Sequence, residues 1–207
     1  MPIPIGDSAL LVFQGDSITA AGRDTDDPAD LGNGFVRMVA ERLSVLHPRA
    51  GVLNRGVSGN RVADLRARWA TDAIDLRPDL LSVMIGVNDT WHRYTHGIRT
   101  PVERFDADYR GLLRQATAVG ARLVLVEPFL VPVRSEQWDW HADLDARIHV
   151  VRRLAAEFDT VLLSADGLLN QAAREAGDPA KIADDGVHLT VVGHSVLADA
   201  WIRLILE

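Results

Sequence analysis

Apolar and polar positions follow two different periods along this chain of 207 residues. Short, nearly continuous apolar runs predict strands that are buried on both faces of a sheet. These runs cover residues 9–13, 51–54, 79–85, 122–126 and 160–163. Between them, apolar residues recur at intervals of three and four, which predicts helices with one buried face. The predicted helices cover residues 34–47, 62–76, 101–119, 143–158, 166–176 and 191–206.

The regular alternation of strand and helix predicts the α/β class, with a parallel sheet between two layers of helices. The sequence contains no internal repeat, linker or low-complexity tract, so we expect a single domain over residues 1–207. The segments that depart from the pattern come directly after strands. In open α/β sheets these segments meet at the carboxyl edge, where ligands bind.

Composition narrows the range of partners. Hydrophobic residues make up 47% and charged residues 25% of the chain, as in ordinary soluble proteins. With 22 basic and 29 acidic residues the net charge is −7, which disfavours nucleic-acid and membrane partners. The absence of cysteine excludes disulfides, thiolate metal sites and a cysteine nucleophile. No signal peptide or membrane-spanning run is visible, and we therefore expect a cytoplasmic protein.

The first apolar run ends in Gly15-Asp16-Ser17, which places a serine at the carboxyl end of a buried strand. Two interpretations of Ser17 are open at this point. The hydroxyl can act as a nucleophile, because the position is one where α/β sheets bind ligands. Alternatively, Ser17 can be the N-cap of the next helix, since serine is common there.

A serine nucleophile needs a base and a group that orients the base. His188 is the candidate base, and Asp185 precedes it by three residues in a turn that contains glycine. Such a turn can bring the carboxylate to Nδ1 of the ring, so that Nε2 faces the serine. Asp184 is a rival for the orienting role. His194 lies in a predicted helix, where we expect it to pack.

A developing oxyanion needs hydrogen-bond donors aimed at it. The candidates are the backbone N–H groups of Ser17 and Gly59 and the side-chain amide of Asn88. Gly59 lies in a glycine-rich turn and Asn88 follows a buried strand. Each has an ordinary alternative, because glycine also starts helices and asparagine also occupies turns and N-caps.

Four aromatic residues fall in segments that the pattern predicts to be loops after strand ends. Flat aromatic rings suit the faces of sugars and short acyl groups, although they can also simply fill these loops. These candidate substrate-binding residues are Trp91, Tyr94, Trp138 and Trp140. By contrast, Trp69 and Trp201 lie on predicted helices and are expected in the core.

Four short blocks together resemble the signature of the SGNH (GDSL) hydrolases, and they occur in the order typical of that family. The blocks are Gly15-Asp16-Ser17, residues 54–60 with Gly59, residues 86–89 with Asn88, and residues 185–188. The resemblance implies a flavodoxin-like three-layer α/β/α sandwich with about five parallel strands. It also implies a triad of Ser17, His188 and Asp185, and an oxyanion hole of Ser17, Gly59 and Asn88. No metal or organic cofactor is implied.

Three further stretches resemble the branch that contains acetylxylan and acetyl-xylooligosaccharide esterases. They cover residues 68–69, 85–91 and 127–129. We therefore expect a serine esterase that removes acetyl groups from small-molecule or oligosaccharide esters. Exposed aromatic residues near the site are compatible with a homo-oligomer.

Two other functions remain open. One is a different acyl hydrolase with the same site: a short-chain arylesterase, a thioesterase, or an enzyme like lysophospholipases or platelet-activating-factor acetylhydrolases. The other, of a different class, is a carbohydrate-binding module without catalysis.

Overall fold

The computed structural model describes residues 5–206. Its five parallel strands form one sheet in the order β2-β1-β3-β4-β5, the order of flavodoxin-like folds. The strands are β1 (Leu10–Gly15), β2 (Gly51–Gly56), β3 (Leu80–Met84), β4 (Arg122–Val126) and β5 (Val161–Leu163). The predicted α/β class and strand number are confirmed.

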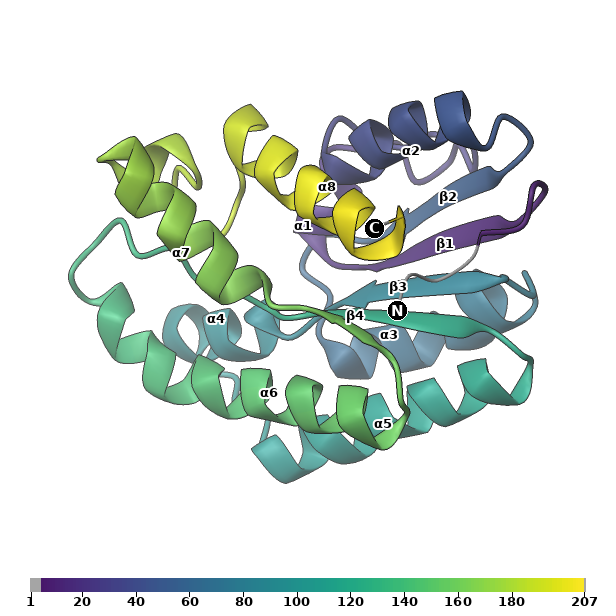
Figure 1. Ribbon diagram of the computed structural model, residues 1–207. Coiled ribbons are helices and arrows are strands. Elements are labelled where there is room, and N and C mark those ends of the chain that lie inside the picture. The colour runs from purple at the N-terminus through teal and green to yellow at the C-terminus, as the bar shows by residue number, and fades with distance from the viewer. Residues whose placement is uncertain (1–4, 207) are drawn as a thin grey trace.

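Both faces of the sheet are covered by helices (Figure 1). The first layer contains α2 (Phe35–Leu46), α7 (Ala165–Ala176) and α8 (Val191–Leu206). The second contains α3 (Val62–Trp69), α5 (Val102–Ala118) and α6 (Gln137–Glu157). Alternate strand residues enter opposite cores, since successive side chains of a strand point to opposite faces. In β1, Leu11 and Phe13 pack in the first core, whereas Val12 packs in the second.

Trp69 and Trp201 lie in the core, as predicted. They are 1% and 0% exposed. Each indole N–H has a partner: Trp69 donates to Leu112 O at 3.1 Å and Trp201 to Ser82 Oγ at 3.0 Å. A buried indole nitrogen without a partner would cost free energy, so both bonds favour this packing. They connect α3 to α5, and α8 to the centre of the sheet.

The structure corrects two predicted boundaries. Residues 87–96, expected as a loop, form the helix α4 (Val87–His96), and α6 begins at Gln137 rather than at 143. The four aromatic candidates are therefore helical: Trp91 and Tyr94 on α4, Trp138 and Trp140 on α6. Aromatic residues have modest helix propensity, so the local sequence did not predict helices at these positions. Packing between them stabilises both, since Trp140 stacks on Tyr94 and meets Trp91 edge to face.

Short helical segments complete the described chain. They are α1 (Ser17–Ala20), η1 (Ala70–Ile74), which continues α3 as a π-helical turn, and η2 (Pro179–Lys181). Within residues 5–206, no helix has both the length and the apolar character that crossing a bilayer requires.

Candidate active site

Ser17 lies at the carboxyl end of β1 and is the first residue of α1. The N-cap of this helix is Asp16, whose Oδ1 accepts a hydrogen bond from the N–H of Ile18 at 3.0 Å. The N-cap interpretation of Ser17 is therefore wrong. The serine hydroxyl instead lies 3.0 Å from Nε2 of His188.

The loop before α8 holds the histidine. Nδ1 of His188 lies 2.7 Å from Oδ2 of Asp185, and Oδ1 of Asp185 accepts the N–H groups of Val187 and His188 at 2.9 and 2.8 Å. The two backbone N–H groups of this turn thus hold the carboxylate in the position from which it contacts the ring. Gln137 adds a contact from α6, donating to the carbonyl of Asp185 at 2.7 Å. Asp184, the rival, is exposed.

Asp185 and His188 each stabilise the charged form of the other. The hydrogen bond that His188 donates to Asp185 raises the pKa of His188 against the opposing effect of burial. Burial alone would raise the pKa of Asp185, but the hydrogen bonds from the His188 ring and from two backbone N–H groups outweigh it and lower that pKa to about 2. Asp185 is therefore ionised at neutral pH, and it stabilises a positive charge on the ring.

The second predicted loop lies beside this serine. Gly59 is exposed and has φ +79°, a left-handed conformation that glycine adopts without strain. Its neighbour Ser58 lines the same cavity as Ser17 and His188. Asn88, in the first turn of α4, donates from Nδ2 to the carbonyl of Asn60 at 3.0 Å. An amide NH₂ has two N–H donors, so this contact leaves one for a ligand.

Two buried aspartates brace these loops. Asp16 caps α1, and Asp89 accepts the N–H of Val62 at the start of α3 at 3.1 Å. Within the described chain, each keeps one buried carboxylate oxygen without a hydrogen-bond partner. Burial raises the pKa of Asp16 to about 7 and that of Asp89 to about 6.

A cavity of about 390 Å³ opens beside Ser17 and His188. Its wall includes Asn33 and His194, which sequence reasoning did not assign to the site. His194 is buried, as expected, and its Nδ1 accepts the N–H of Phe35 at 3.2 Å. Burial lowers its pKa to about 4, so the ring is neutral and carries its proton on Nε2. The sequence signal for its place in the cavity wall is its position six residues after His188.

Three of the four aromatic candidates form one group, and Trp138 makes a separate stack. Trp91, Tyr94 and Trp140 pack together, and Trp138 stacks on His141 with 64% of its area exposed. These four side chains do not line the cavity at Ser17. Among residues 5–206, no group of three or more histidine, aspartate and glutamate side chains is placed to hold a metal ion.

Known proteins are similar to this chain in both sequence and fold. The model of the GDSL-like Lipase/Acylhydrolase family matches residues 13–196. The acetylxylan esterase of Geobacillus stearothermophilus is 34% identical, over 96% of this chain and 94% of that protein.

Solved structures agree with this match. Axe2, an acetylxylan esterase from the same organism, superposes with a TM-score of 0.89 at 33% identity, covering 100% of this chain and 97% of Axe2. LAE5, an alpha/beta hydrolase enzyme from the metagenome of Lake Arreo in Spain, gives 0.89 at 27% identity, covering 100% and 98%. Catalytic mutants of Axe2 replace a serine, a histidine or an aspartate by alanine. The chain belongs to the GDSL-like lipase/acylhydrolase family and is a carboxylic ester hydrolase.

Proposed function

We propose that this chain is a serine esterase that removes acetyl groups from carbohydrates such as xylo-oligosaccharides, through an acyl-enzyme on Ser17. The observation that carries the proposal is the continuous contact from Ser17 Oγ through the His188 ring to Asp185, with distances of 3.0 and 2.7 Å. These are the distances of a nucleophile, a general base and an orienting carboxylate.

In the first half of the reaction, Ser17 Oγ attacks the acetyl carbonyl and its proton passes to Nε2 of His188. Asp185 stabilises the imidazolium ion that results. The N–H groups of Ser17 and Gly59 and the amide of Asn88 donate to the oxyanion. The intermediate collapses, the sugar hydroxyl leaves with the proton from His188, and an acetyl ester remains on Ser17.

In the second half, His188 removes a proton from water, which attacks the acetyl-enzyme. A second oxyanion forms in the same place and collapses, releasing acetate. The proton on His188 returns to Ser17 Oγ. The enzyme is thereby restored without a metal or cofactor taking part in any step.

The acetyl and carbohydrate preferences have separate support. The cavity beside Ser17 is about 390 Å³, which suits a short acyl group better than a long chain. Its apolar wall includes Ile18, Leu189 and Val191. On α4, Trp91 lies one helical turn beyond Asn88. Tyr94 on α4 and Trp138 on α6 are 39% and 64% exposed, which leaves aromatic surface for contact with a sugar. The relationship to acetylxylan esterases favours the same substrate class.

The deciding experiment compares acetate release from acetylated xylo-oligosaccharides with hydrolysis of acetyl thioesters and of p-nitrophenyl esters of increasing acyl length. We expect the oligosaccharide to have the highest kcat/KM, and the aryl series to fall beyond short acyl chains. Faster turnover of thioesters or long-chain esters would contradict the carbohydrate assignment. Absence of turnover, together with failure of a fluorophosphonate to label Ser17, would favour a binding module instead.

A further inference from the structure

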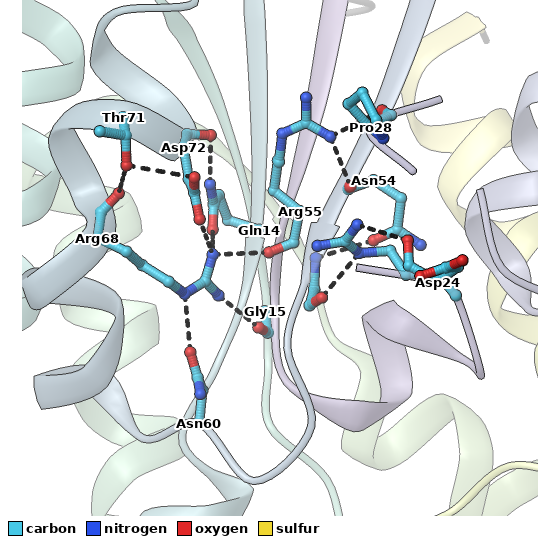
Figure 2. Close-up of polar contacts among 12 residues, drawn as sticks. Gln14, Gly15, Asp24, Pro28, Asn54, Arg55, Asn60, Arg68, Thr71 and Asp72 are labelled. Carbon is cyan, nitrogen blue, oxygen red and sulfur yellow. Dashed lines mark hydrogen bonds and ion pairs between the residues drawn. The ribbon is translucent and has the colours of Figure 1, made fainter. Parts of the chain in front are cut away.

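Arg68 occupies an unusual position at the end of α3. Its side chain is only 18% exposed, and its guanidinium group lies at the carboxyl ends of β1 and β2 (Figure 2). Nη1 lies 2.8 Å from both Arg55 O and Asp72 Oδ2, and 3.0 Å from Gln14 Oε1. Asp72 offsets the buried charge. The other partners belong to the two strands that lead into the proposed active site.

One contact reaches the segment that carries Ser17. Nη2 of Arg68 donates to the carbonyl of Gly15 at 3.1 Å, and the same carbonyl accepts the N–H of Val57 at 3.1 Å. Gly15 is bonded directly to Asp16, the residue before Ser17. The position of this carbonyl therefore helps to set the position of the Ser17 N–H at the start of α1.

A second contact reaches the other two proposed donors. Nε of Arg68 donates to Oδ1 of Asn60 at 2.8 Å, as Figure 2 shows. The backbone carbonyl of Asn60 accepts the amide of Asn88 at 3.0 Å. Gly59 directly precedes Asn60, and the N–H of Asn60 closes the turn by donating to Val57 O at 3.2 Å. Asn60 thus joins Arg68 to both Gly59 and Asn88.

The geometry points to Arg68 as a positioning residue that holds the three oxyanion donors, Ser17 N–H, Gly59 N–H and the Asn88 amide, in register with one another. The inference rests on the proposed function, because it assigns a role within that oxyanion hole. A guanidinium group suits the task, since its five N–H donors have fixed directions and can reach several acceptors at once. The contacts of Arg68 do not include His188 or Asp185, so its effect is separable from proton transfer.

The test compares Arg68→Lys with Arg66→Lys. Arg66 lies on the same helix, is exposed, and pairs with Asp108 away from the strand ends. A lysine at 68 keeps the charge but cannot reach both Gly15 and Asn60. Misplacement of reacting groups by about 1 Å can cost about 100-fold, so we expect kcat/KM per active site to fall roughly 10- to 100-fold for Arg68→Lys. Arg66→Lys should stay within about 2-fold of the unaltered enzyme.

Methylboronic acid supplies a readout that a role in folding alone would not change. Its boron accepts an electron pair from Ser17 Oγ, whose proton passes to His188, and the adduct places a hydroxyl where the oxyanion forms. Active sites are counted by complete fluorophosphonate labelling. For Arg68→Lys, the inhibition constant should rise by the same factor as kcat/KM falls, while the midpoint of the acidic limb of the pH profile stays unchanged. An unchanged inhibition constant or a shifted midpoint would overturn the inference.

Asn60→Ala provides a second route if Arg68→Lys does not fold. It removes the contact with Arg68 Nε and keeps the carbonyl that Asn88 uses. We expect a loss of roughly 10-fold in both kcat/KM and boronic acid affinity, and the double variant should lose less than the product of the single losses. Unaltered values in Asn60→Ala would overturn the inference. An inactive unaltered enzyme, or an active Ser17→Ala, would instead overturn the proposed function.

Discussion

The two halves of the candidate site are built in opposite ways. The half that transfers protons, Ser17 with His188 and Asp185, is open to solvent, and the His188 side chain is 52% exposed. In the half proposed to face the developing charge, Asn88 is only 7% exposed, although Gly59 is exposed. Contacts of the first half lie mostly within one turn of the chain. In the second, the contacts of Asn60 with Asn88 and Arg68, and of Arg68 with Gln14 and Gly15, connect residues that are 8 to 54 positions apart.

The difference follows from what each half does during the reaction. In the proposed mechanism His188 gains and loses a full charge in each half-reaction, and its exposure lets solvent stabilise the charged state. The oxyanion donors stay neutral throughout and gain efficiency by being fixed in place beforehand. Two contacts to Asn60, from Arg68 and Asn88, supply that rigidity. The comparison predicts that changes in the first half alter pH dependence, whereas changes in the second half alter only rate.

Ser17→Ala tests the centre on which both halves converge, and it has the largest expected effect. Without a nucleophile, kcat should fall by about 10⁶-fold, as in other serine hydrolases that lose this group. Circular dichroism and thermal unfolding should be unchanged, since the hydroxyl contacts only His188. Ser44→Ala, on an exposed turn of α2, is the matched control. Turnover by Ser17→Ala above about 1% of the unaltered rate would require another nucleophile.

Asp185→Ala tests the proton-transfer half. We expect kcat to fall by about 10⁴-fold, close to the loss of the orienting aspartate elsewhere. Asp185 raises the pKa of His188, so its removal lowers that pKa and keeps the base neutral at lower pH. The acidic limb of the kcat/KM profile should therefore move to lower pH.

Asp184→Ala is the control for that profile. Asp184 is exposed and has a smaller influence on the His188 pKa, so its removal should move the limb far less. If the two variants shift the limb equally, Asp185 is not the group that stabilises the imidazolium ion.

Asn88→Ala tests the oxyanion half. Losing one donor costs about 2.7–4 kcal/mol of transition-state stabilisation, or about 10²–10³ in kcat. KM and the acidic limb should be unchanged, because the amide acts on charge that exists only in the transition state. Asn88→Asp keeps the shape but brings an anion near the oxyanion, and it should be at least as slow. A change mainly in KM would assign Asn88 to substrate binding.

The two halves also differ in how far the sequence predicts them. The buried strands were predicted because parallel strands covered on both faces carry long apolar runs. The Asp185–His188 pair was predicted because both residues lie in one short turn. Gly59 and Asn88 were candidate donors from their positions after strands, and the family resemblance favoured that role over their ordinary ones in turns and caps.

The contacts of Arg68 and the places of Asn33 and His194 in the cavity wall were not predicted. Arg68 acts on the carbonyls of Gly15 and Arg55, and a carbonyl is the same in every residue type. His194 was expected only to pack, since nothing in its helix indicates that the ring reaches the cavity. The aromatic helices were missed because Tyr94 and Trp140 stabilise them by contacts across the fold rather than by local propensity.

Trp138→Ala has the smallest expected effect and tests whether the exposed indole of Trp138 on α6 binds sugar. The indole is 64% exposed and stacks on His141, so its removal should cost little stability. We expect KM for acetylated xylo-oligosaccharides to rise roughly 3- to 10-fold, the loss of about 1 kcal/mol from one aromatic contact. Acetate release from p-nitrophenyl acetate, which has no sugar, is the internal control and should be unchanged. Equal losses on both substrates would mean that Trp138 stabilises α6 and does not bind sugar. The carbohydrate preference would then depend on the cavity wall near His194.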